Sequence, residues 1–423
     1  LTPSCSTNVT PHVLDRWVCD GVKTACITEE ELCGFYACAA SGDACRDSCT
    51  LPSHCTTGFC FNADGSCRDC WAKGFGSTGK DVVSDVVLDA QGNTIVVGTF
   101  VGTVTFGTKA LTATSSTGDL FVLKLDPKGA VSWVVHGRGG VQKLQLGVSG
   151  SGDVVVVGLI HGQTLRFGPT TLTASVVGQV FVLRLTSSGT HSWVKAFHDI
   201  SPVVAVDTSG NAYLAGTYTG TISVGGKQAT STSPYDLFVA KLDHSGNVVW
   251  LTSRAGAYDG GVNAIAVSNS GQVAVVSETE GPTAIDAALS TFKPSGTKDW
   301  EVNLTNANEK YLYDVAFGAG GIYVVGHFQT AVKLGPSITL TPGAGSAEEG
   351  FVAQFSTTGT ALAAVQTVGN GGTIYLSHVA ATPSGVVVGG FLEPGNATFG
   401  GKPLVGTGAW IAALDLSNQV QWA

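Results

Sequence analysis

The fold of this chain is decided by a stretch that recurs: DLFVLKLDPKGAVSW at residues 119–133 returns as DLFVAKLDHSGNVVW at residues 236–250. Each copy reads as an apolar strand, a turn that contains glycine, and a second strand that ends at tryptophan. Glycine supplies the positive φ of such a turn, and Asp or Asn bonds the local backbone. The stretch therefore predicts a pair of adjacent β-strands that is repeated along the chain.

A wider repeat surrounds this strand pair. A glycine near the end of an apolar run recurs at intervals of 60, 58, 110 and 63 residues: Gly98, Gly158, Gly216, Gly326 and Gly389. The long interval holds one shorter copy, in which Ser277 takes the place of the glycine. Each copy predicts four strands, and five copies insert a hairpin marked by motifs such as Phe106-Gly107 and Phe167-Gly168. The chain thus contains six copies of about 60 residues.

Four short strands per copy can bury their apolar faces only against neighbouring copies. Closure into a ring achieves this burial and protects the sheet edges. The sequence therefore predicts an all-β protein whose residues 71–423 form a six-bladed β-propeller. Trp71 starts a seventh strand of the tryptophan type, which is surplus to the six sets. That strand would close the ring by pairing with the last blade or beside its Trp422 strand. Seven blades are the alternative, which the family resemblance described next implies.

The repeated string resembles the SBBP-type propeller repeats of bacterial surface proteins, which are common in myxobacteria. So does the Phe-Gly hairpin with its trailing Leu111-Thr112 and Leu172-Thr173. The segment from Tyr36 to Cys49 is similar to cysteine-rich modules of secreted myxobacterial proteins. The resemblance implies a secreted bacterial β-propeller. It implies no reaction, because the family shares no motif of functional residues.

All eleven cysteines lie between Cys5 and Cys70. Such a cluster indicates either zinc or disulfides, and zinc sites of the ribbon type need the C-x2-C spacing twice. Only Cys67 and Cys70 have that spacing here. Residues 1–70 are therefore predicted to be a small disulfide-stapled module in an oxidising compartment. The chain starts at Leu1, and we expect that a secretion signal was removed from it.

A C-x6-C spacing recurs in this module and suggests disulfides across hairpins. The predicted pairs are Cys19 with Cys26, Cys38 with Cys45, Cys49 with Cys60, and Cys55 with Cys67. Cys5, Cys33 and Cys70 remain. Because eleven is odd, one thiol is free or bonded to another chain, and sequence alone does not decide which.

Motifs for catalysis and cofactors are lacking. GFGSTGK at residues 74–80 matches the start of a phosphate-binding loop, but Asp81 stands where Ser or Thr should bind magnesium. Neither a Gly-x-Ser-x-Gly elbow nor a His-Glu-x-x-His motif occurs, so we predict no catalytic, cofactor or metal residues. One cluster offers an alternative to this prediction. Asp85, Asp314 and His378 occupy equivalent first-strand positions. They would meet in a central channel, as a polar lining or as a cation or proton site.

These observations predict a non-enzymatic structural or interaction protein that is secreted or at the cell surface. Its partners would be other copies of itself, as in a filament, or cell-surface components. An adhesin that binds polysaccharide or peptide is the alternative, and a hydrolase or lyase with its site in the channel is the second alternative. A net charge of −9 disfavours nucleic acid, and no apolar run reaches the roughly 18–20 residues that cross a bilayer.

The first prediction concerns the redox state of the cysteines. Labelling the unfolded, unreduced protein with a thiol reagent should detect at most one free thiol, because the others are oxidised. Reduction should destabilise residues 1–70, where each disulfide contributes about 2–4 kcal/mol. It should leave the cysteine-free repeats folded. Labelling of many cysteines would contradict the oxidised state.

Overall fold

The computed structural model describes residues 18–19, 26–27, 73–162, 164–174, 179–197, 203–280, 285–304, 310–343, 348–369 and 373–422. It divides the chain into two units, one of residues 1–74 and 128–130 and one of residues 75–127 and 131–423. All regular elements in the described residues are β-strands. No helix there is long and apolar enough to cross a membrane. The predicted all-β class is confirmed.

The described residues of the larger unit form six four-stranded antiparallel groups, each of which follows one sequence repeat and is called a sheet below. Sheets 1 and 2 are continuous through β8, and sheets 5 and 6 are joined by pairing of β29 with β31. Sheet 1 contains β3 (Val82–Leu88), β4 (Thr94–Phe100), β7 (Asp119–Leu125) and the start of β8 (Val131–Val148); sheet 2 contains the end of β8, β9 (Val154–Ile160), β12 (Gln179–Leu185) and β13 (His191–Phe197); sheet 3 contains β14 (Val203–Val206), β15 (Ala212–Tyr218), β18 (Asp236–Leu242) and β19 (Val248–Ala255). Sheet 4 contains β20 (Ala257–Val267), β21 (Val273–Glu280), β22 (Ile285–Phe292) and β23 (Lys298–Leu304); sheet 5 contains β24 (Lys310–Gly318), β25 (Gly321–Phe328), β28 (Glu349–Phe355) and β29 (Ala361–Gly369); sheet 6 contains β30 (Ile374–Thr382), β31 (Gly385–Phe399), β32 (Lys402–Asp415) and β33 (Val420–Trp422).

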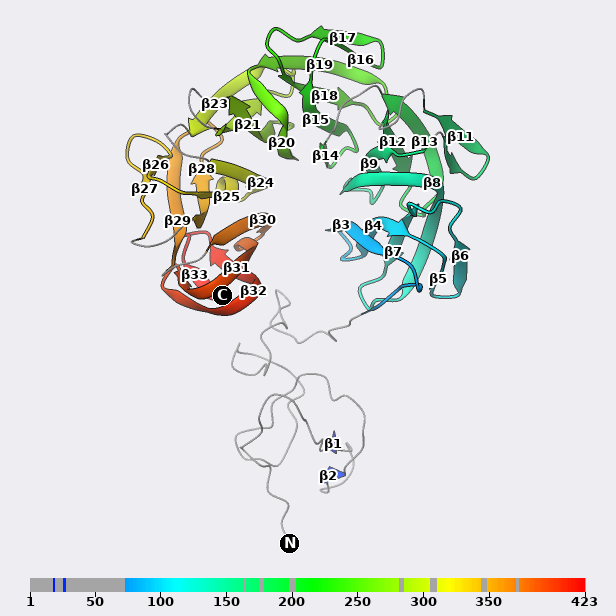
Figure 1. Cartoon of the computed structure of the whole chain (residues 1–423), viewed down its shortest axis with the longest axis horizontal. Helices are drawn as coiled ribbons and strands as arrows, with labels where there is room; N and C mark the ends of the chain where they lie inside the picture. Colours follow the sequence, from blue (N-terminus) through cyan, green and yellow to red (C-terminus); the bar gives the residue numbers. More distant parts are fainter. Residues whose placement is uncertain are drawn as a thin grey trace. The chain divides into compact units, whose positions relative to one another are not determined.

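The sheets of this unit follow one another around a common centre in sequence order (Figure 1). Their first strands, such as β14, β20 and β24, lie on the inner side. The arrangement is propeller-like, as the sequence predicts. Four inserted hairpins form strand pairs: β5 (Thr103–Phe106) with β6 (Lys109–Thr112), β10 (Thr164–Phe167) with β11 (Thr170–Thr173), β16 (Thr221–Val224) with β17 (Lys227–Thr230), and β26 (Val332–Lys333) with β27 (Thr339–Leu340). Three of these pairs are separate, and β10 also pairs with β8. In sheet 6 the same hairpin is the extended end of β31 and β32.

Apolar side chains pack between consecutive sheets and form five buried clusters. Between sheets 1 and 2, for example, Val122 of β7 packs in the same cluster as Leu146 of β8. Third strands such as β7 and β12 are buried on both faces, which explains why they read as continuous apolar runs. Full burial of one such side chain contributes about 1.5–3 kcal/mol. The clusters therefore hold each sheet to the next.

At four of these junctions, a tryptophan on the fourth strand adds a hydrogen bond to the apolar packing. The indole N–H of Trp250 donates to the Pro294 carbonyl of the next sheet at 3.0 Å, and its ring lies against Gly296. Three equivalent bonds of 2.9–3.0 Å join Trp133 to Ser187, Trp193 to His244, and Trp300 to Thr357. The turn glycine of the repeated string is thus required twice, for its positive φ and for the space that the indole fills.

The junction between sheets 5 and 6 departs from this pattern in both partners. Ala363 occupies the position of the tryptophan, and Asn418, at φ 59°, replaces the turn glycine. The amide Nδ2 of Asn418 instead donates to Oε1 of Gln354 at 2.6 Å. The glycine is therefore replaced at the one junction where no indole needs its space.

The first and last sheets each leave one face uncovered by the described residues. Val86 of β3 is 56% exposed, whereas the residues at its register position in sheets 2 to 6 are only 5–8% exposed. Ile411 of β32 is 42% exposed, whereas its counterparts in sheets 1 to 5 are 0–1% exposed. No cluster of the described residues joins sheet 6 to sheet 1. Trp71, the predicted closing strand, lies outside the described residues.

The second prediction tests the contact between indole and glycine. Gly296 has φ 89°, and an added Cβ would lie 2.6 Å from Cδ2 of Trp250. Gly226 has φ 86°, and its Cβ would meet nothing within 4 Å. Gly226→Ala should cost only the backbone strain of about 1 kcal/mol, whereas Gly296→Ala should cost about 2 kcal/mol more because the rings must also move. Denaturant unfolding of the two variants measures the difference. Equal losses would show that the indole contributes nothing at this junction.

Candidate functional site

The predicted channel cluster occupies one register position on three inner strands. Asp85, Asp314 and His378 each follow directly after a bulge in β3, β24 and β30. The same position holds Gln145, Val203 and Ala264 in sheets 2, 3 and 4. The alignment made from the sequence is therefore correct for this position.

Both aspartates of this cluster join neighbouring sheets. Asp314 accepts the backbone N–H of Val315 in its own strand at 2.8 Å and that of Val379 in sheet 6 at 2.9 Å. Asp85 likewise accepts the N–H of Val86 at 2.7 Å and that of Leu146 in sheet 2 at 2.8 Å. Each carboxylate is therefore already bound to two backbone donors.

Electrostatics couple the three residues. Burial raises the pKa of Asp314 to about 6; the N–H groups of Val379 and Val315 and the nearby His378 act to lower it, and Asp85 acts to raise it. The pKa of Asp85 is also raised by burial, against the effect of its two backbone bonds and of His378. His378 itself is exposed, and its Nδ1 lies 2.8 Å from the Ser377 hydroxyl. Asp314 is therefore the member of the cluster that exchanges its proton at about pH 6. Within the described ranges, no three His, Cys, Asp or Glu residues are grouped to hold a metal ion.

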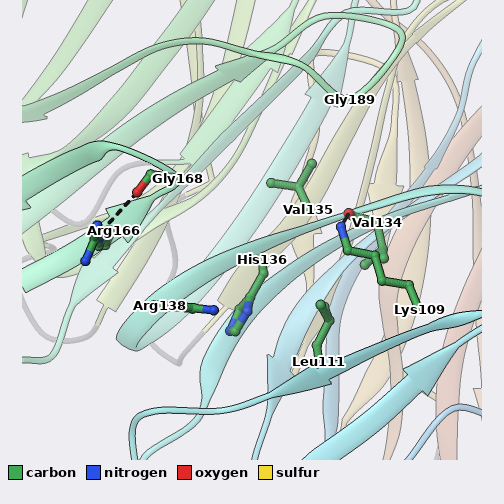
Figure 2. A pocket seen from close by; sticks show the side chains of 9 residues that line it. All are labelled: Lys109, Leu111, Val134, Val135, His136, Arg138, Arg166, Gly168 and Gly189. Carbon is green, nitrogen blue, oxygen red and sulfur yellow. Dashed lines mark hydrogen bonds between the residues drawn. The ribbon is translucent and has the colours of Figure 1, made fainter.

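A second site, absent from the sequence-based prediction, is a pocket of about 450 Å³ at the junction of sheets 1 and 2. Leu111 and Val134 contribute apolar surface, and Lys109, Arg138 and Arg166 contribute positive charge. Figure 2 shows His136 and Arg138 projecting from β8, with Arg166 on one side of them and Lys109 on the other. We call this site the cationic pocket.

Asp119 holds His136 at the pocket. The two side chains are 2.8 Å apart, and Asp119 also accepts the N–H groups of Thr114 and Gly139. Burial acts to raise the pKa of Asp119, but these hydrogen bonds outweigh it and hold the pKa below its usual value. This residue is the first of the repeated string, and its role there is to anchor the loop before the third strand.

Most predicted disulfide residues cannot be compared with the structure. Cys5, Cys33, Cys38, Cys45, Cys49, Cys55, Cys60, Cys67 and Cys70 lie outside the described residues. In the smaller unit, β1 (Val18–Cys19) pairs antiparallel with β2 (Cys26–Ile27), and the register sets Cys19 opposite Cys26. Residues opposite each other on antiparallel strands have the Cα separation that a disulfide needs. This pairing stays a prediction.

Known proteins give only a distant likeness. No family model and no curated protein sequence matches the chain, so the assignment to SBBP-type repeats stays an interpretation. A protein of unknown function from Dyadobacter fermentans is 11% identical, with 79% of this chain and 96% of that chain covered and a TM-score of 0.39. A DUF4221 family member from Bacteroides vulgatus is 9% identical, with 81% and 96% covered and a TM-score of 0.39. An inactive virginiamycin B lyase from Staphylococcus aureus is 9% identical, with 79% and 96% covered and a TM-score of 0.30. Likenesses of this size carry no conclusion about function.

The third prediction concerns pH. Because the pKa of Asp314 rises from 3.8 to about 6 on folding, the folded state holds this proton more tightly than the unfolded state. This tighter proton binding contributes fully to the stability of the folded state below pH 4. The contribution is lost as the pH rises to about 6, which lowers the free energy of unfolding by up to about 3 kcal/mol. Asp314→Asn cannot titrate, so its stability relative to wild type should rise over that interval.

Denaturant unfolding at several pH values between 4 and 7 measures this difference. Asp243→Asn is the matched control, because hydrogen bonds from Asn247 lower the pKa of Asp243 instead of raising it. Its stability relative to wild type should therefore not rise over this interval. A constant difference for Asp314→Asn would contradict the raised pKa.

Proposed function

We propose that this protein is a non-enzymatic, extracellular structural or interaction protein, secreted or at the cell surface of a bacterium. In this proposal a six-bladed β-propeller follows a small disulfide-rich module, and the protein assembles with other copies of itself. The channel residues support a structural role, because Asp85 and Asp314 use their carboxylates to join sheets. That use favours a structural role for the two carboxylates over the hydrolase or lyase alternative.

The observation that carries the proposal is the pair of uncovered end faces. Val86 and Leu88 of sheet 1 are 56% and 63% exposed, and Phe391 and Ile411 of sheet 6 are 45% and 42% exposed. The Val86 and Ile411 positions are buried wherever a neighbouring sheet is present, so these faces have the composition of an interface. We expect another segment of protein to pack on these two end faces and to contribute strands of its own.

We assign this place to residues 1–70 of a second copy. An odd number of cysteines leaves one sulfur for a bond to another chain. A module of this size buries little core of its own, so it gains stability by docking on a larger apolar surface. A contact between one molecule's module and the next molecule's propeller is heterologous, and such contacts generate rings or filaments.

The fourth prediction is that assembly depends on both surfaces. Light scattering should show the full chain as an oligomer, and it should show the chain without residues 1–70 as a monomer. Val86→Lys and Ile411→Lys should also give monomers, because each places a charge on an apolar end face. Val249→Lys is the control, since Val249 is 49% exposed but lies in β19 of sheet 3. This variant should assemble like wild type.

Two results would overturn the assignment. If the truncated protein keeps the oligomeric state of the full chain, residues 1–70 are not the assembling segment. If the full chain is a monomer and truncation alone exposes an apolar surface to a fluorescent dye, the module covers its own propeller instead.

A further inference from the structure

Two arginines face each other across neighbouring strands at the cationic pocket. Arg138 of β8 and Arg166 of β10 are direct partners in antiparallel register. Like charges directly opposite on adjacent strands destabilise a sheet. The pair therefore needs an explanation other than the stability of the fold.

The backbone forces this pairing. β8 carries an irregularity between its pairings with Asp119 and Leu120, which leaves Arg138 and Gly139 as extra residues. The equivalent pairing of β18 with β19 in sheet 3 has no such shift at Asp236 and Leu237. Bulges of this kind redirect side chains and are frequent beside functional sites.

Glycines on both sides of Arg138 allow the hairpin to approach. A Cβ on Gly137 would lie 2.6 Å from the Phe167 ring, and one on Gly139 would lie 2.2 Å from the carbonyl oxygen of Thr164. Among the described strand pairs of the inserted hairpins in sheets 1, 2, 3 and 5, only β10–β11 also pairs with a further strand, which is β8. Close contact at this point thus brings Arg166 to Arg138.

The other repeats show that the fold does not require the two arginines. Four equivalent hairpin positions correspond to Arg166, and they hold Thr105, Ser223, Lys333 and Thr398. The position of Lys109 holds Thr170 in the next hairpin but Lys227 and Lys402 in two others, so this lysine follows the repeat. Three cations are therefore gathered at one junction of a chain whose net charge is −9.

The three cations form no ion pair within the described ranges: none of these pairs includes Lys109, Arg138 or Arg166. The carboxylate of Asp119 at the pocket is bonded to His136 and to the N–H of Gly139. Lys109 donates to the Val134 carbonyl at 3.1 Å, and Arg166 donates through Nε to the Gly168 carbonyl at 3.0 Å. These bonds fix both side chains at the pocket and leave further N–H groups for a ligand.

We propose that the cationic pocket binds a compact oxyanion: a carboxylate, sulfate or phosphate group on a small ligand. Arginine side chains suit such groups because their N–H donors match two oxygens at once. A volume of about 450 Å³ lies in the range of small-molecule sites. The net negative charge of the chain disfavours long polyanions and leaves compact ones as the ligands that fit. This site is independent of the assembly proposed above.

The fifth prediction is tested by calorimetric titration of the full chain at low ionic strength. Inorganic sulfate, inorganic phosphate and D-glucuronate are the probes, and D-glucose is the neutral counterpart of the last. Wild type should bind at least one anion and not glucose, and added sodium chloride should weaken binding. A preference for glucuronate identifies an acidic sugar as the source of the oxyanion, and a preference for the inorganic ions identifies free sulfate or phosphate.

Arg138→Gln and Arg166→Thr should each weaken anion binding by at least about tenfold, because a charge-assisted hydrogen bond is lost. Lys333→Thr is the matched control, since it removes a cation from the position of Arg166 in another hairpin and should bind like wild type. Without ligand, the two arginine variants should melt no lower than wild type, because each relieves a like-charge pair. The proposal is wrong if wild type binds none of the three anions, or if the arginine variants bind them as tightly as wild type.

Discussion

Burial of apolar side chains between consecutive sheets is the interaction on which this structure depends. A four-stranded sheet has two faces, and its third strand is apolar on both, so each sheet needs a neighbour on either side. Five clusters meet this need for the inner junctions. The uncovered faces at Val86 and Ile411 follow from the same requirement, because each belongs to a sheet that has only one neighbour among the described residues.

Polar groups in this molecule mainly refine the packing. The indole of Trp250 and the carboxylate of Asp314 both reach from one sheet to a backbone group of the next. They act at different junctions and on opposite edges of their sheets, Trp250 on an outer strand and Asp314 on an inner strand. Arg138 and Arg166 stand apart, because they set two like charges opposite each other on adjacent strands and neither forms a described ion pair.

Repetition made the strands predictable from sequence. One string, read at residues 119–133 and 236–250, contains the third strand, the turn and the fourth strand, and the register position of Asp85, Asp314 and His378 followed from aligning the copies. The cationic pocket did not follow, because Arg138 lies in a bulge that breaks the alignment. A sequence signal did exist in the glycines around Arg138 and in the arginine that replaces Thr or Ser before Phe167. Closure between the last and first sheets through the strand at Trp71 stays a prediction, because Trp71 lies outside the described residues.

The junction between sheets 5 and 6 has a consequence for how the molecule comes apart. In an array where each unit touches only its neighbours, stability is a sum of local terms, and the unit with the weakest contacts opens first. Sheet 6 lacks the indole bond, since Ala363 stands in its place, and its far face is uncovered at Ile411, so its remaining ties are the apolar cluster with sheet 5 and the pairing of β31 with β29. Its amide protons should therefore exchange with solvent through a partial opening that leaves sheets 2 to 4 closed. Residues 373–422 would then behave as a detachable end of the array, one that can open and re-form while the rest of the chain stays folded.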